Sequence, residues 1–163
     1  MRNLLKALPP SIGLLRKLHT LICDENLLSD LPKEIGSCVQ LTVLHVAKNR
    51  LSRIPSEIGH LSNLKVLSIS GNSLLHLPVS ILNIPKLGAI WLSETQSKPL
   101  LPLNKEIDAY TGQHVLTCFL LPQLPASDLD PKGNFIYLFI KMGRILNHFL
   151  AQEQRGIWMP LKI

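Results

Sequence analysis

Residues 41–63 read LTVLHVAKNRLSRIPSEIGHLSN, and the same spacing returns before and after this stretch. One leucine begins it, and further apolar residues follow at Leu44 and Val46. Asn49 comes next, and it is one of three asparagines that stand 23 residues apart, with Asn26 and Asn72. Self-similarity at a fixed period of about 20 to 50 residues predicts a chain built from stacked repeats.

The consensus is that of the leucine-rich repeat. Each copy contains L-x-x-L-x-Φ-x-x-N, where Φ is apolar, and its second half contains a Leu-Pro or Ile-Pro step. One copy cannot bury its own apolar face, so the copies must stack as a solenoid. We therefore predict an α/β-type leucine-rich repeat fold, with an extended or 3-10 convex side and a helix-containing C-terminal cap. The concave side should carry parallel strands at residues 20–22, 43–45, 66–68 and 89–91.

The three asparagines are predicted to form a structural ladder. Each follows a strand, where the chain turns and leaves backbone groups without strand partners, and an amide side chain can bond such groups. The same columns place Cys23 with Val46, and Cys38 with Leu61. These two cysteines are therefore predicted to be core residues rather than reactive thiols.

The residues that vary between copies should face the inner curve of the solenoid, where repeat proteins commonly bind their partners. An exposed tryptophan there would suit an interface anchor, although the alternative, that Trp91 is simply buried beneath the cap, is favoured. The predicted partner-binding residues are Thr20, Ile22, Asp24, Val43, His45, Lys48, Val66, Ser68, Ser70, Ala89, Trp91 and Ser93.

Composition excludes several other classes. The chain has 163 residues and a formal charge of +6. The charge is spread along the chain without a basic, aromatic stripe, which argues against nucleic-acid binding. Its three cysteines show no zinc spacing or disulfide framework, as in a reducing compartment. No metal, cofactor or small-molecule substrate is predicted, and no secretory signal or membrane-spanning stretch is expected.

The 23-residue pattern ends where the next asparagine is expected, because Thr95 stands at that position. The segment WLSETQS at 91–97 and the segment VLTCFLLPQ at 115–123 follow the break. Together they resemble the region after the repeats in the LAP family (leucine-rich repeat and PDZ proteins, including Scribble, Erbin and Lano). In that family an asparagine stands at the position of Thr95.

This resemblance implies a protein-protein interaction scaffold. LAP proteins act in epithelial polarity, and they are cytoplasmic and peripheral at the basolateral membrane and cell junctions. Their repeats bind polarity proteins. They usually carry many more repeats than this chain, and most carry PDZ domains, so the resemblance predicts a truncated form. The alternative is a regulatory repeat protein of Ras, GTPase or phosphatase signalling, but such proteins share the repeat and lack the cap motif.

We divide the chain into a partial repeat at 1–17, repeats at 18–95, a cap segment at 96–126 and a divergent tail at 127–163. Three interpretations of the apolar, basic tail remain open. It could pack on the solenoid as a further cap, lie on a membrane surface as an amphipathic helix, or have no evolved role.

Catalysis is not predicted. His114 and Cys118 stand four residues apart, which would pair them on a helix. A thiol nucleophile also needs an orienting third group and an oxyanion site, and the sequence offers neither. We therefore expect Cys118 to be part of an apolar cap helix, and no residue is assigned a catalytic role.

Overall fold

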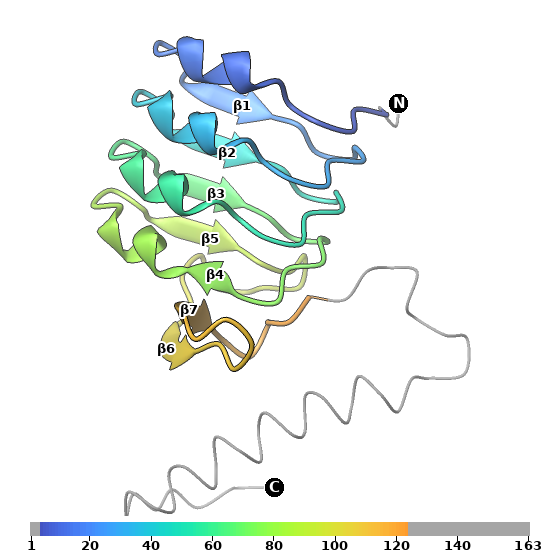
Figure 1. The fold of residues 1–163 in the computed structure, drawn as a ribbon, viewed down its shortest axis with the longest axis vertical. Coiled ribbons are helices and arrows are strands. Elements are labelled where there is room, and N and C mark those ends of the chain that lie inside the picture. Colours follow the sequence, from blue (N-terminus) through green and yellow to red (C-terminus); the bar gives the residue numbers. More distant parts are fainter. Residues whose placement is uncertain (1–3, 124–163) are drawn as a thin grey trace, which may run out of the picture. The chain divides into compact units, whose positions relative to one another are not determined.

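The structure is a computed structural model and describes residues 4–123. Figure 1 shows short strands stacked one on the next, with a turn and a return segment between successive strands. The strands pair in parallel in the order β1-β2-β3-β5, in the register of the repeat. Their bounds are Thr20–Ile22 (β1), Val43–His45 (β2), Val66–Ser68 (β3) and Ala89–Trp91 (β5), as predicted.

Each return segment contains a 3-10 helix. The four helices are η1 (Pro10–Leu14), η2 (Lys33–Ser37), η3 (Ser56–His60) and η4 (Val79–Asn83). A proline precedes each of them in an extended conformation, for example Pro55 with φ −65° and ψ 145°. The pyrrolidine ring fixes φ near this value. The repeated apolar-proline step therefore sets where each helix begins.

Neighbouring return segments approach so closely that a side chain would obstruct their packing. A Cβ atom at Gly59 would lie 2.6 Å from the carbonyl oxygen of Ser80 in the next repeat. The corresponding position of the last repeat is Leu82, which is 61% exposed. No further repeat packs against Leu82 within residues 4–123, so its side chain meets no such constraint.

The core is a column of leucine and isoleucine side chains between the strands and the return segments. Fully buried examples are Leu44, Leu67, Ile58 and Leu51. In the first repeat the equivalents of Leu41 and Leu44, Leu18 and Leu21, are only partly buried. Cys38 is fully buried, as predicted, whereas Cys23 is half-buried because β1 is the edge of the sheet.

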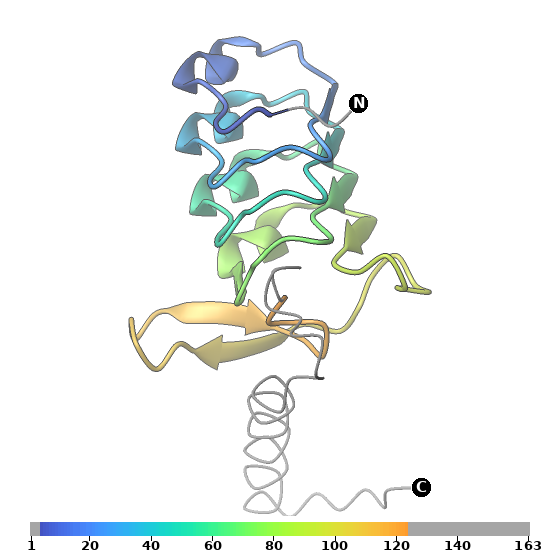
Figure 2. The ribbon, with the colours of Figure 1, turned by 90° about the vertical axis from the view of Figure 1, so that its right-hand side faces the viewer.

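A β-hairpin closes the C-terminal end of the solenoid. Strands β6 (Asn104–Ile107) and β7 (His114–Thr117) pair antiparallel, and β7 also pairs with β4 (Leu77–Pro78) in the last return segment. Figure 2 shows the hairpin lying across the end of the stack. Leu116 is 1% exposed and belongs to the core cluster. The hairpin thereby covers the apolar end of the last repeat.

The prediction of a helix across His114 and Cys118 is wrong. The open side of the last return segment offers backbone partners, and β7 pairs with it instead of forming its own helical hydrogen bonds. The turn between β6 and β7 also favours a hairpin over a helix. Asp108 accepts hydrogen bonds from the amide and the hydroxyl of Thr111, and Gly112 adopts a positive φ of 68°.

The predicted tail, residues 127–163, lies outside the described residues. Within residues 4–123, no helix is long and apolar enough to cross a bilayer.

Candidate protein-binding face

Strand register brings the predicted binding residues into rows across the concave sheet. Ile22 pairs with His45, His45 with Ser68, and Ser68 with Trp91. A second row joins Thr20, Val43, Val66 and Ala89 in the same way. Alternate residues of a strand point to opposite faces, and the intervening Leu44 and Leu67 are fully buried. The two rows therefore share the concave face, as predicted.

Exposure along these rows is uneven. Ile22 is 63% exposed, while His45, Val66 and Trp91 are half-buried. Trp91 is thus neither fully exposed nor fully buried. The prediction of exposure is wrong for Ser68, Ser70 and Ala89, which are 8%, 6% and 8% exposed. Strands in a sheet lie about 4.8 Å apart, so these small side chains are shielded by larger neighbours.

Asp24 and His45 form one polar contact on this face. The Oδ2 atom of Asp24 lies 3.5 Å from Nδ1 of His45. The Oδ1 atom of Asp24 accepts a hydrogen bond of 2.7 Å from the amide of Ala47. The carboxylate therefore joins the first repeat to the second at the end of the strands.

A second polar cluster surrounds Lys48 at the turns after the strands. Its ammonium group lies 3.5 Å from Oε1 of Glu25 and 3.0 Å from Oε1 of Glu94. The hydrogen bond to Glu94, followed by the charges of Glu94 and Glu25, raises the pKa of Lys48. Lys48 is therefore protonated at neutral pH. Sequence analysis placed Lys48 on this face but did not identify the two carboxylates as its partners.

The asparagine ladder is present, and each member joins adjacent repeats. The amide nitrogen of Asn49 donates to the carbonyl oxygens of Cys23, Val46 and Ala47, and its Oδ1 accepts from the amide of Leu28. Asn72 repeats this pattern one copy later, accepting from Leu51. Asn26 is similar, accepting from Leu5. The predicted ladder is confirmed.

Gln123 continues the ladder beyond the break at Thr95. Its Oε1 accepts from the amide of Leu74 at 3.3 Å, and its Nε2 donates to the carbonyls of Ile69 and Leu92, each at 2.9 Å. These groups lie 23 positions after the partners of Asn72. Sequence reasoning missed this role. The available signal was a glutamine that ends the VLTCFLLPQ segment.

Gln96 protects the outer edge of β5. Its Oε1 accepts from the amide of Leu92 at 2.9 Å, and its Nε2 donates to the carbonyl of Ile90 at 2.7 Å. The amide of Ile90 in turn donates to the carbonyl of Pro99. An unpaired strand edge is a template for pairing with other chains. Gln96 of the WLSETQS segment and the nearby Pro99 thus satisfy the hydrogen bonds of this edge.

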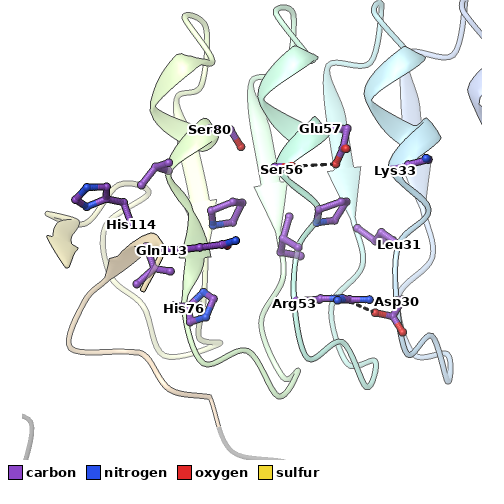
Figure 3. A pocket seen from close by; sticks show the side chains of 15 residues that line it. Asp30, Leu31, Lys33, Arg53, Ser56, Glu57, His76, Ser80, Gln113 and His114 are labelled. Atoms are coloured by element: carbon purple, nitrogen blue, oxygen red, sulfur yellow. Dashed lines mark hydrogen bonds and ion pairs between the residues drawn. The ribbon is translucent and has the colours of Figure 1, made fainter. Parts of the chain in front are cut away.

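A separate open groove of about 510 Å³ runs along the return segments and β7. Figure 3 shows Arg53 and Asp30 directed toward one another there. Nε of Arg53 donates a hydrogen bond of 3.2 Å to Oδ1 of Asp30. The amide of Glu57 and the hydroxyl of Ser56 lower the pKa of the Glu57 carboxyl. The residues that line the groove carry both positive and negative charges. Within residues 4–123, no set of three or more His, Cys, Asp or Glu groups is arranged to hold a metal.

The cysteines show no sign of activation. Burial raises the pKa of the thiols of Cys23, Cys38 and Cys118. A raised pKa disfavours the thiolate, which is the nucleophilic form. Cys38 instead donates a hydrogen bond to the carbonyl of Ile12.

Comparison with known proteins agrees with this architecture. The family profile described as Leucine rich repeat matches residues 39–96. The protein Scribble homolog let-413 of Caenorhabditis elegans is 49% identical over 43 residues, which is 26% of this chain and 6% of that protein. The human leucine-rich repeat-containing protein 7 is 50% identical over 40 residues, covering 24% of this chain and 3% of that protein.

Two solved structures also match. The LRR protein LIC12759 of Leptospira interrogans shares 31% identity and a TM-score of 0.45, over 56% of this chain and 29% of that one. A chain of the BIR3–SERK2 complex from Arabidopsis thaliana shares 30% identity and a TM-score of 0.45, over 58% of this chain and 53% of that one. The matches to curated relatives span only a small fraction of those relatives. Residues 39–96 thus carry leucine-rich repeats, as both the matching profile and the stacked parallel strands indicate.

Proposed function

We propose that this chain is a protein-protein interaction scaffold of the LAP type, acting in cell polarity at the basolateral membrane and cell junctions. Its concave face would be the docking surface. The fold supports an interaction module, because a stacked sheet offers a broad surface for a protein partner.

One observation carries the assignment to the LAP type. The two segments that resemble the LAP cap have structural roles that a generic repeat would not require. Gln123, at the end of VLTCFLLPQ, takes over the hydrogen bonds of the missing asparagine. Gln96, within WLSETQS, closes the edge of β5. The partial matches to a Scribble homolog and to leucine-rich repeat-containing protein 7 also support the proposed LAP type.

The test is the location of a fluorescently tagged chain in polarised epithelial cells. We compare the wild type with a His45→Ala, Trp91→Ala variant of the concave face. A matched control is His60→Ala, Tyr110→Ala, which removes one histidine and one aromatic residue from exposed positions elsewhere. Thermal unfolding of both variants verifies that the fold persists.

The proposal predicts enrichment of the wild type and the control at the lateral cortex, and loss of enrichment in the concave-face variant. Diffuse cytoplasmic fluorescence of all three proteins would contradict the proposed location. Equal cortical enrichment of all three would contradict the assignment of docking to His45 and Trp91.

A further inference from the structure

Two carboxylates of the concave face converge on a single cation. The ammonium nitrogen of Lys48 lies 3.5 Å from Glu25 and 3.0 Å from Glu94. All three side chains are at least half exposed. Glu25 and Glu94 come from the first and the last of the four repeats, so the stacking of the solenoid alone brings them near one ammonium group. The position of that group is a preformed site for a cation.

Gly71 makes this arrangement possible. It stands between Lys48 and Glu94 in the column of turn residues, with a positive φ of 65°. A Cβ atom there would lie 3.3 Å from Cγ of Lys48. Because Gly71 has no side chain, the lysine can extend across it toward Glu94. The same gap leaves the ammonium group open to solvent and to an incoming partner.

The face beside this cluster carries two small polar residues, Ser68 and Ser70. Ser68 and Ser70 are 8% and 6% exposed. Ser68 lies in register between His45 and Trp91, on the concave side of the sheet. A serine hydroxyl can donate and accept a hydrogen bond, so a peptide backbone on this face could bond to Ser68 and Ser70.

The charge of the face is opposite to that of the chain. The strands and turns of the concave side contribute three carboxylates, Asp24, Glu25 and Glu94, and one lysine, Lys48. The chain as a whole carries +6. Complementary charge on a partner favours encounter and fixes its register. This acidic surface within a basic chain therefore selects for a basic partner.

We infer that the concave face takes an extended peptide segment carrying a lysine or arginine, whose cationic group replaces that of Lys48 between Glu25 and Glu94. This inference rests on the proposed function and names the chemistry of the partner. The peptide backbone would meet the hydroxyls of Ser68 and Ser70, and an apolar side chain beside the cation would pack on Trp91. Lys48 acts as an internal competitor that the partner displaces.

The test is an NMR titration of the full chain with the peptide Ser-Leu-Ser-Arg-Ser-Leu-Ser. Two matched peptides carry glutamine or glutamate in place of the arginine. Resonances of Ser68, Ser70 and the indole of Trp91 report binding on the concave face. The variants are Lys48→Met, which removes the competitor, and Glu94→Gln, which removes one carboxylate. Glu106→Gln on the exposed strand β6 is the matched control.

We expect the arginine peptide to shift the concave resonances. Exposed ion pairs have small energies, so its dissociation constant should fall about threefold in Lys48→Met and rise about threefold in Glu94→Gln. Glu106→Gln should match the wild type, and the glutamate peptide should bind most weakly.

Equal affinity for the three peptides, or affinities unchanged by Lys48→Met and Glu94→Gln, would overturn the inference while leaving the docking face intact. Absence of shifts by the arginine peptide in both wild type and Lys48→Met would also overturn it. Cortical localisation in cells tests the scaffold proposal separately, so each idea can fail without the other.

Discussion

Gln123 makes the hydrogen bonds that the ladder lacks at Thr95. It accepts from the amide of Leu74 and donates to the carbonyls of Ile69 and Leu92, which are the partners expected of an asparagine one repeat after Asn72. The ladder therefore ends in a residue from the cap rather than from a repeat. This contact ties the cap to the last two strands.

Gln123→Ala should destabilise the fold by about 3 kcal/mol, because it leaves a buried amide and two carbonyls without partners. The midpoint of urea unfolding measures this change. The control is Gln113→Ala, an exposed glutamine of the hairpin, which should change stability by less than about 0.5 kcal/mol. Equal effects of the two substitutions would contradict the role of Gln123.

Loss of a ladder asparagine should cost more in the middle of the stack than at its first repeat. The Oδ1 atom of Asn49 accepts from a buried amide, that of Leu28, whereas Asn26 accepts from Leu5, which is 42% exposed. We expect about 3 kcal/mol for Asn49→Ala and about 1 kcal/mol for Asn26→Ala, since water can replace the exposed partner. Calorimetric unfolding would distinguish the two, and the reverse order would refute this explanation.

Gly59→Ala should be destabilising by about 1 to 3 kcal/mol, because the new Cβ would press on the carbonyl of Ser80. Leu82→Ala, at the equivalent place in the last repeat, should be tolerated within about 0.5 kcal/mol because Leu82 is exposed. Comparison of the two thermal midpoints checks the close approach of the return segments. A neutral Gly59→Ala would mean that the repeats can separate there without cost.

The hairpin turn should weaken as the pH falls. Hydrogen bonds from Thr111 lower the pKa of Asp108 in the fold. The unfolded chain then takes up its proton first, so the stabilisation is present above the ordinary pKa of 3.8 and is lost as the pH falls through the lowered value. Asp108→Asn should lower the thermal midpoint at pH 7. The difference in thermal midpoint between this variant and the wild type should narrow as the pH falls below 3.8, and a difference independent of pH would argue against the carboxylate.

Much of the repeat region could be predicted from sequence, because a fixed period constrains every copy at once. The four concave strands and the three ladder asparagines follow from aligned columns that include Leu44, Leu67 and Ile90. The cap followed no such period. Val115 and Leu116 suit a helix or a strand equally well, and the choice depended on pairing with Leu77 and Pro78 far along the chain.

The candidate face was predicted in outline but not in detail. Strand alternation placed His45, Ser68 and Trp91 on one side, yet it could not show that Ser68 is shielded by its neighbours. The contact of Lys48 with Glu94 spans two repeats and depends on the missing side chain of Gly71. A contact between residues of different repeats can be identified only once the repeats are stacked in three dimensions.

The most direct test of docking on the concave face is photo-crosslinking in polarised epithelial cells. A photoreactive amino acid replaces either Ile22, on the concave face, or Leu82, on the convex side, which are 63% and 61% exposed. We predict protein adducts from position 22 that disappear when His45→Ala and Trp91→Ala are added, and few adducts from position 82. Equal adducts from both positions, or none from position 22, would contradict the assignment of the concave face as the docking surface.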